Sequence, residues 1–326
     1  MSKITRRAAG AALLPLLAAP ALQAQPAWPD RNIRLIVPFG AGGAVDTLSR
    51  IVAARFPEVA NGHTLVVENR PGAGGTIAGA FTAQQRPDGQ TLMMADIGAN
   101  AIGKELNPSL SYDPMTAFSP IIHLVNLPSV LLAHPTIEAR TTQEVIELAR
   151  ARPDGYTYSS AGNGNGSHLF MELFLRRAGI RMVHVPYRSG AELVTALVRG
   201  DVQFAFPSVS SALSMIREGR VRAIGVGSPA GTPLLPETRP VADVLPGFNT
   251  AIWHGILAPA GMDRELVLRI NAVFARIAAM PEVVEQVARQ QAGQMVPGTP
   301  EAFATHIRTE FDTWAPIIRE ANIRAS

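Results

Sequence analysis

The stretch IRLIVPFGAGGAVD, residues 33–46, sets a pattern that the rest of the chain repeats. Its first half has the composition of a buried strand, and from Val45 to Phe56 apolar residues recur at helical spacing. A glycine turn between a strand and a helix often cradles an anion. Nucleotides fit poorly, because the dinucleotide motif needs a glycine where Val45 stands and the nucleotide-triphosphate loop needs a lysine that this stretch lacks.

The succession of strand, glycine turn and helix recurs along the chain. A second predicted strand leads into RPGAGG (residues 70–75), and a third enters a loop at Asp96. A strand at 156–160 leads into GNGNGSH (residues 162–168), which opens an amphipathic helix. This alternation predicts α/β architecture with parallel strands, whose carboxyl-end loops bind ligands. Further strands are predicted at residues 182–187, 202–206 and 221–227, and after residues 251–259 the chain is mainly helical.

The first 24 residues differ in character from the rest. Lys3, Arg6 and Arg7 precede a short apolar run, and the small residues of ALQA offer a cleavage site after Ala24. This is the pattern of an export signal peptide, and the choice between the general and the twin-arginine route stays open. After it, no apolar run approaches the roughly 20 residues that a membrane-spanning helix needs.

Charge and cysteine content exclude several classes of partner and site. The chain has 29 basic and 26 acidic residues, a net charge of +3. Lys3, Arg6 and Arg7 account for this excess, so the chain without its predicted signal is neutral and gives no indication of a nucleic-acid or anionic-membrane partner. Cysteine is absent, which excludes disulfides, thiolate metal ligands and cysteine nucleophiles.

No catalytic or metal-binding motif stands out. The chain contains neither a G-x-S-x-G nucleophile turn nor an H-E-x-x-H zinc motif. His168 and Glu172, four residues apart on a predicted helix, could share a metal ion, but without further clustered ligands a local hydrogen bond of His168 is the favoured interpretation. His184 alternates with apolar residues and is interpreted as a hydrogen-bonded sheet residue. We therefore expect no metal and no organic cofactor.

Several motifs, taken in order, resemble those of one family. Besides the stretch 33–46, they are VVENRPGAGG (66–75), YDPMTAF (112–118), SSAGNGNGSH (159–168), VHVPYRSG (183–190) and WHGILAPAG (253–261). This series resembles the Bug family, the TctC-type periplasmic solute receptors of tripartite tricarboxylate transporters. The similarity runs from about Trp28 to Ile323, nearly the whole chain after the predicted signal.

The resemblance implies a type II periplasmic binding fold, in which two α/β domains enclose a ligand cleft. Residues 25–124 and 255–326 would form the first domain, and residues 125–254 the second. The cleft would hold a small di- or tricarboxylate, or an aromatic carboxylate, through backbone amides and small polar side chains. A periplasmic monomer of this kind would deliver its ligand to an integral-membrane permease. An exported enzyme that acts on a small acid in the same cleft is the alternative.

The resemblance also implies which residues meet the ligand. They are Phe39, Gly40, Gly42, Gly43, Ala44 and Asp46 in the first loop, Gly72 and Ala73 in the second, Gly162, Asn163, Asn165, Ser167 and His168 in the third, and also Tyr187, Asp96 and Pro207. Two of these depart from the family pattern. Pro207 stands where many members carry an aspartate that meets an ammonium group, which argues against an amino-acid ligand. Asp96 stands where many members carry a small hydroxyl residue, and it would either cap the next helix or bring a carboxylate to the cleft.

Overall fold

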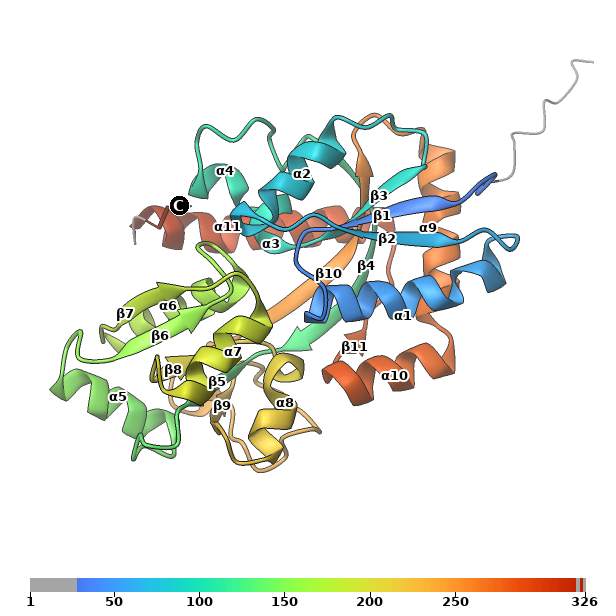
Figure 1. Ribbon diagram of the computed structural model, residues 1–326. Coiled ribbons are helices and arrows are strands. Elements are labelled where there is room, and N and C mark those ends of the chain that lie inside the picture. Colours follow the sequence, from blue (N-terminus) through green and yellow to red (C-terminus); the bar gives the residue numbers. More distant parts are fainter. Residues whose placement is uncertain (1–27, 321–322, 325–326) are drawn as a thin grey trace, which may run out of the picture.

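The computed structural model describes residues 28–320 and 323–324, and the predicted signal peptide and its cleavage site lie outside these residues. Two sheets, each packed against helices, lie beside one another (Figure 1). The part of the chain around the sheet that contains the first strand is called the first domain, and the part around the other sheet the second domain.

The first sheet has six strands in the order β11-β4-β10-β3-β1-β2. Its strands are β1 (Ile33–Val37), β2 (Leu65–Asn69), β3 (Thr91–Ala95), β4 (Phe118–Pro128), β10 (Ala251–Pro259) and β11 (Gln294–Met295). β1 pairs parallel with β2 and β3, as the alternating pattern predicts. β10, however, runs antiparallel to both β3 and β4, so the prediction of parallel strands is wrong for this half of the sheet.

The second sheet has five strands in the order β7-β6-β8-β5-β9. Its strands are β5 (Val130–Ala133), β6 (Thr157–Ser160), β7 (Val183–Pro186), β8 (Phe204–Ala205) and β9 (Arg222–Val226). β6 is parallel to β7 and β8, whereas β5 is antiparallel to β8 and β9. Both sheets are thus mixed. β4 and β5 are absent from the sequence-based prediction, because no glycine turn followed by a helical pattern marks this run of strand.

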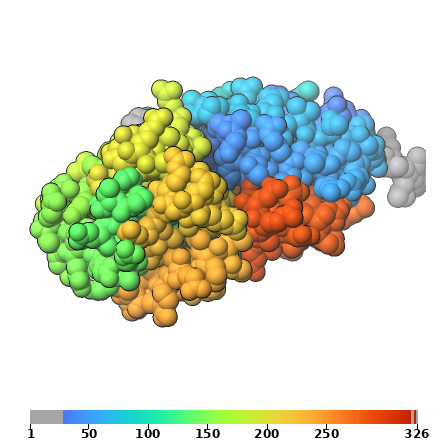
Figure 2. Space-filling model, turned by 60° about the horizontal axis from the view of Figure 1, so that its bottom comes forward, coloured from blue at the N-terminus to red at the C-terminus, as the bar shows by residue number. Residues whose placement is uncertain are grey.

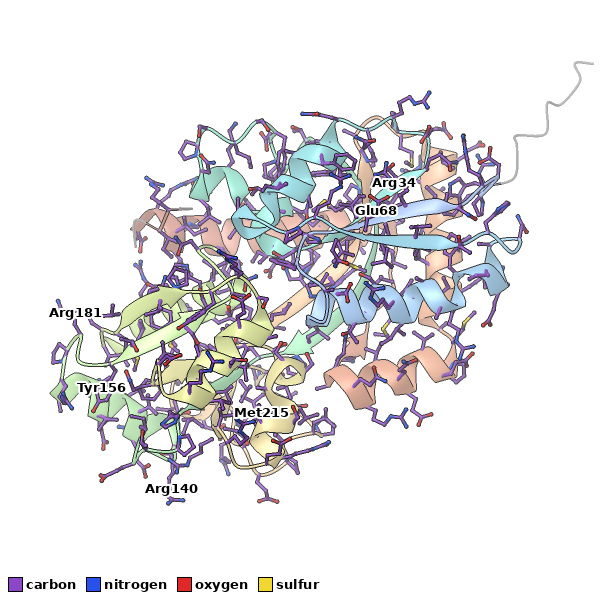
Figure 3. The ribbon with its side chains drawn as sticks, in the orientation of Figure 1. Arg34, Glu68, Arg140, Tyr156, Arg181 and Met215 are labelled. Carbon is purple, nitrogen blue, oxygen red and sulfur yellow. The ribbon has the colours of Figure 1, made fainter. Side chains whose placement is uncertain are left out.

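Helices pack on both sheets. In the first domain they are α1 (Ala44–Val59), the short η1 (Ala73–Gly75), α2 (Thr76–Ala83), α3 (Ile97–Asn100), α4 (Gly103–Leu106), α9 (Arg264–Ala278), α10 (Pro281–Gln291) and α11 (Pro300–Glu320). In the second they are α5 (Thr142–Ala151), α6 (Gly166–Ala178), α7 (Gly190–Arg199), α8 (Val209–Arg217) and η2 (Val241–Asp243). The cores join where Phe170 of α6 meets Trp314 of α11, with ring centroids 5.9 Å apart. The side-chain view in Figure 3 shows how densely both halves are filled.

The chain crosses between the sheets twice, and the two crossings lie against each other. Ser129 separates β4 from β5, and Thr250 precedes β10. The two buried hydroxyl oxygens are 2.8 Å apart, and Ser129 Oγ also donates to the Thr250 carbonyl at 3.1 Å. Gly227, at the end of β9, donates to the Ser129 carbonyl and accepts from the Thr250 amide. The predicted domain boundaries, at 124/125 and 254/255, fall inside β4 and β10. We propose these crossings as the points of division.

The packing at the crossing leaves no room for a methyl group on Gly227. A Cβ at Gly227 would lie 2.1 Å from Ser129 Oγ and 2.9 Å from the Thr250 carbonyl oxygen, so the Gly227→Ala variant must push backbone aside. We expect it to lower the free energy of unfolding by about 1–3 kcal/mol, the usual cost of overpacking a core, in urea titrations. Gly298→Ala is the control, because its nearest neighbour would be 3.7 Å away. Equal stability of the two variants would contradict the packing described here.

Candidate functional site

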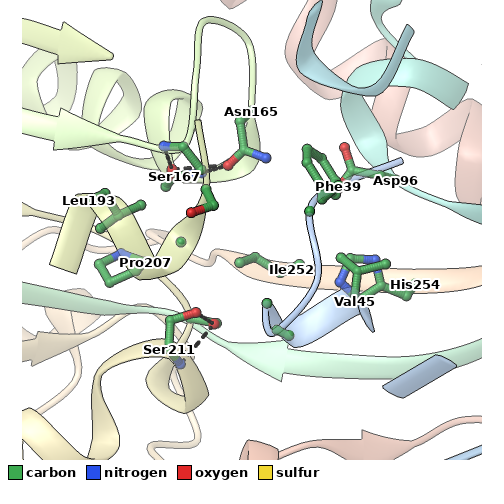
Figure 4. A pocket seen from close by; sticks show the side chains of 17 residues that line it. Phe39, Val45, Asp96, Asn165, Ser167, Leu193, Pro207, Ser211, Ile252 and His254 are labelled. Atoms are coloured by element: carbon green, nitrogen blue, oxygen red, sulfur yellow. Dashed lines mark hydrogen bonds between the residues drawn. The ribbon is translucent and has the colours of Figure 1, made fainter. Parts of the chain in front are cut away.

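A cavity of roughly 530 Å³, including its opening, lies where the loops of the two domains meet (Figure 4). Figure 2 shows the seam between the two domains on one face of the molecule. The first domain contributes Phe39, Gly40, Gly43, Ala44, Val45, Asp96, Ile252 and His254, and the second contributes Ala161, Asn165, Ser167, Ser189, Gly190, Leu193, Pro207, Ser208 and Ser211.

Four long helices begin at this cavity. α1 starts after Gly43, α6 after Asn165, α7 after Ser189 and α8 after Ser208, and each of these four preceding residues lines the cavity. The first N–H groups of a helix lack intrahelical partners and carry the positive end of its dipole. Gly43 provides no side-chain cap for α1, so ligand atoms can approach the backbone there directly. The cavity is therefore built to attract negative charge.

Asn165 offers an amide N–H group to the cavity. Its side-chain oxygen accepts hydrogen bonds from the Ser167 amide at 3.0 Å and from the Ser167 hydroxyl at 2.9 Å. The amide nitrogen of Asn165 is thereby turned away from α6, toward Phe39 on the opposite wall (Figure 4). The Ser167 hydroxyl also accepts from the Ala161 amide, so its proton is already used within the loop. Of these two predicted residues, Asn165 is the better donor to a ligand.

Apart from Asp96 and His254, the remaining lining is apolar or uncharged, and no lysine or arginine occurs among the described residues that line the cavity. Leu193, Pro207 and Ile252 form apolar patches between the polar ends (Figure 4). Ser211 lies beside Ser208, with hydroxyl oxygens 2.7 Å apart. An anion held here would meet backbone dipoles and neutral hydrogen-bond donors, and an aliphatic or aromatic body would meet carbon.

Asp96 both caps a helix and lines the cavity. Its Oδ1 accepts from the Gly98 amide at 2.9 Å, which makes it the N-cap of α3, and only 3% of the residue is exposed. Burial raises the pKa of Asp96 to about 7, and the Gly98 hydrogen bond opposes this only in part. Asp96 thus fills both roles that the sequence left open, because it caps α3 and also brings a carboxyl group to the cavity.

Asp46 and Gly42 do not line this cavity. The Asp46 carboxylate accepts hydrogen bonds from the Gly42 amide, the Asn69 side chain and the Arg50 guanidinium at 2.9–3.0 Å. Burial alone would raise its pKa, but these hydrogen bonds outweigh burial and hold the pKa below its ordinary value. Asp46 therefore shapes the turn that exposes Gly40 and Gly43. Gly42 borders a smaller neighbouring pocket.

Four other predicted residues, Gly72, Ala73, Gly162 and Asn163, lie in loops that meet beside the cavity rather than in its lining. A Cβ at Gly74 would lie 3.2 Å from the Asn163 carbonyl oxygen, and one at Gly98 would lie 3.4 Å from that of Gly164. These contacts join the loops of the two domains at their backbones. Tyr187 is also outside the lining, and its amide donates to the Ser160 carbonyl.

His168 belongs to a buried network behind the loop. Its Nδ1 accepts from the Gly164 amide at 3.0 Å, the local hydrogen bond favoured from the sequence. Its ring stacks on that of His184 at 3.9 Å, and His184 Nε2 lies 2.6 Å from Ser160 Oγ. Burial lowers the pKa of His168 to about 3 and that of His184 to about 4. Both imidazoles are therefore neutral and hold the loop in place.

Sequence reasoning missed several lining residues. Ser189 caps α7 by accepting from Glu192, and the spacing Ser-x-x-Glu was a readable capping signal. Ser208 caps α8 in the same way without that acidic partner. His254 enters from antiparallel β10, a position that the sequence pattern does not show. Others missed are Val45, Ala161, Gly190, Leu193, Ser211 and Ile252.

Neither a metal-binding cluster nor a membrane-spanning helix occurs among the described residues. Among these residues, no group of three or more histidine, aspartate and glutamate side chains is placed to hold a metal ion. His168 Nε2 and Glu172 Oε1 are 3.8 Å apart, and the Tyr158 hydroxyl donates to that glutamate oxygen. None of the described helices combines the length and the apolar character needed to span a membrane.

Comparison with known proteins gives a consistent result. Residues 48–323 match the family described as "Tripartite tricarboxylate transporter family receptor" (TctC). A relative from Pseudomonas sp. (strain P51), described as a UPF0065 protein in the tcbD-tcbE intergenic region, is 35% identical over 320 residues. The match covers 98% of this chain and 94% of the relative.

Three solved structures are also similar. One is an R. palustris protein with adipate, 28% identical with a TM-score of 0.86, and the match covers 91% of this chain and 99% of that one. The second is MatC from Rhodopseudomonas palustris with bound malate, 27% identical with a TM-score of 0.82, and the match covers 89% of this chain and 100% of that one. The third is the periplasmic binding protein BugD, 27% identical with a TM-score of 0.83, and the match covers 91% of this chain and 99% of that one. The predicted periplasmic binding fold is confirmed by these similarities.

The buried histidine predicts a pH dependence of stability. The pKa of His168 is about 3 in the folded chain and about 6.5 when unfolded, so below pH 6.5 only the unfolded state takes up this proton. Its contribution to stability is complete above pH 6.5 and is lost as the pH falls toward 3. His168→Asn keeps an acceptor for the Gly164 amide but removes the proton site. Between pH 6 and 4.5 we expect the variant's free energy of unfolding to fall less steeply, by up to about 1.4 kcal/mol per pH unit. Identical slopes would contradict a neutral, buried His168.

Proposed function

The chain belongs to the family of tripartite tricarboxylate transporter receptors, and we propose that it captures a small carboxylate in the cavity between its domains. The matching family is one of receptors and not of enzymes, and its match extends over residues 48–323. This sets aside the alternative of an exported enzyme. The observation that carries the proposal is the start of four long helices at one cavity whose described lining has no basic side chain.

The shape of the lining supports a ligand with a charged end and a carbon body. A carboxylate at the starts of α6, α7 and α8 would accept hydrogen bonds from backbone amides and from Asn165. Leu193, Pro207 and Ile252 would cover the carbon atoms behind it. The similar proteins determined with adipate and malate make dicarboxylates the first candidates, followed by tricarboxylates and aromatic carboxylates.

Several predicted residues serve this proposal in different ways. Phe39, Gly40, Gly43, Ala44, Asn165, Ser167, Asp96 and Pro207 line the cavity and would contact the ligand. Gly72, Ala73, Gly162 and Asn163 would hold the two domains together around it. Asp46, Gly42, His168 and Tyr187 would shape the loops from behind.

We also propose the route and the partners. The first 24 residues would direct export to the periplasm, where similar proteins act, and the processed monomer would pass its carboxylate to a membrane permease without a cofactor or nucleic-acid partner. We expect a periplasmic extract to contain a chain that begins at Gln25. Intact-mass measurement and light scattering check the processing and the monomer. A retained leader or a stable dimer would contradict this proposal.

Carboxylate binding should depend on the amide of Asn165. Asn165→Asp keeps the oxygen that caps α6 but replaces the amide donor by a negative oxygen, which would repel a carboxylate. In titration calorimetry with succinate, glutarate and adipate, we expect the affinity for each acid that binds the unaltered chain to fall at least tenfold, about 1.4 kcal/mol. The loss combines a missing hydrogen bond with the unfavourable approach of two like charges.

Asn61→Asp is the matched control for this experiment, because it adds the same charge at an exposed position outside the cavity lining. We expect it to change the affinities by less than about threefold, since exposed charges are screened by solvent and salt. Equal losses in the two variants would mean that net charge, and not the Asn165 amide, governs binding. Failure of all three acids to bind the unaltered chain would argue against dicarboxylates as ligands.

A further inference from the structure

The wall of the cavity on the first domain carries a hydrogen-bond acceptor with no partner. His254 lies on β10, lines the cavity next to Val45 and is fully buried (Figure 4). Its Nδ1 is 3.1 Å from the Ala95 carbonyl oxygen, and since a carbonyl only accepts, Nδ1 carries the proton. Nε2 of the neutral ring is then an acceptor, and none of the described residues donates to it.

A second acceptor follows directly in the chain. Asp96 is the residue after Ala95, and its Oδ1 accepts from the Gly98 amide. No described residue donates to the other carboxyl oxygen, Oδ2, and Asp96 also lines the cavity. Burial keeps the pKa of Asp96 near 7, so that around neutral pH this group can hold a proton and donate as well as accept.

These two groups do not match a fully ionised dicarboxylate. Its oxygens are acceptors, like His254 Nε2, and a buried acceptor without a donor is costly. A hydroxyl group matches both, because it can donate to Nε2 and accept from protonated Asp96. An ammonium group matches less well, because its positive charge would leave water and would find only Asp96, partly protonated near pH 7, as a counter-charge in the described lining.

We propose that Asp96 and His254 form a specificity pair that selects a hydroxycarboxylate, with its carboxylate toward the starts of α6, α7 and α8 and a hydroxyl group toward β10. This inference rests on the proposed function and names the ligand class within it. Asp96 is one of the positions at which the sequence departs from the pattern of the family it resembles, and the pair supplies a physical reason for an acid at this site.

Matched acids that differ in one group test the proposal. Titration calorimetry at pH 7 compares succinate, malate and aspartate, then glutarate, 2-hydroxyglutarate and glutamate, then phenylacetate, mandelate and phenylglycine. Within each set that binds, we expect the hydroxy acid to bind at least tenfold more tightly than the unsubstituted acid and the amino acid. A site built to hydrogen-bond a hydroxyl group rejects the analogue that lacks it.

Two variants connect this preference to the pair. Asp96→Ser keeps an oxygen that can cap α3 and removes the second carboxyl oxygen, Oδ2, which is the proposed donor to the ligand hydroxyl. His254→Asn keeps an N–H group within reach of the Ala95 carbonyl and removes Nε2. In each variant we expect the affinity ratio of hydroxy acid to unsubstituted acid to fall below about threefold. The ratio is internal to each variant, so a general loss of affinity or stability does not affect it.

The outcomes separate the inference from the function on which it rests. If the unsubstituted acid or the amino acid binds most tightly in every set that binds, the hydroxyl assignment is overturned while carboxylate binding stands. If both variants keep the full preference, Asp96 and His254 are not its source. If none of the nine acids binds, the proposed function fails for these compounds, and this inference fails with it.

Discussion

An anion bound between two domains that offer it no lysine or arginine needs several unpaired backbone N–H groups to stabilise its charge. The described architecture supplies them by beginning α1, α6, α7 and α8 at one cavity. Three of these starts are capped by a small polar side chain, so the first turn stays ordered while its dipole faces the ligand. α1 is the exception, because Gly43 leaves its start open to close approach.

The rest of the structure serves to hold these helix starts in place. Asp46 fixes the first loop through the Gly42 amide, Asn69 and Arg50, and the His168–His184 pair fixes the third from behind. Ser129 and Thr250 link the two crossing segments to each other through buried hydrogen bonds. The Ser129–Thr250 pair is buried, whereas the Arg50 side chain that helps to fix Asp46 is more than half exposed. His254 Nε2, by contrast, is a buried acceptor in the cavity wall to which no described residue donates.

The sequence predicted the glycine loops well because strand, turn and helix leave a local signal. The loops that carry Gly40, Gly43, Asn165 and Ser167 were found in this way, and these four residues line the cavity. His254 was out of reach for a different reason: the segment 251–259 was not assigned to a strand, and the direction and neighbours of β10 depend on strand pairing across 159 residues. Asp46 lies in the first turn of α1, yet its side chain faces back to the Gly42 turn, and this depends on Arg50 of the same helix and on Asn69 at the end of β2.

The glycine contacts beside the cavity have a consequence for how such a receptor can evolve. The loops of the two domains approach each other closely there at Gly74, Asn163, Gly98 and Gly164, and none of these four residues lines the cavity. Substitutions at Pro207, Ser211 or Asp96 can therefore alter the cargo without rebuilding the contact between the loops. One scaffold can diversify into receptors for many acids by point changes, because recognition and docking of the two halves are inherited through different atoms.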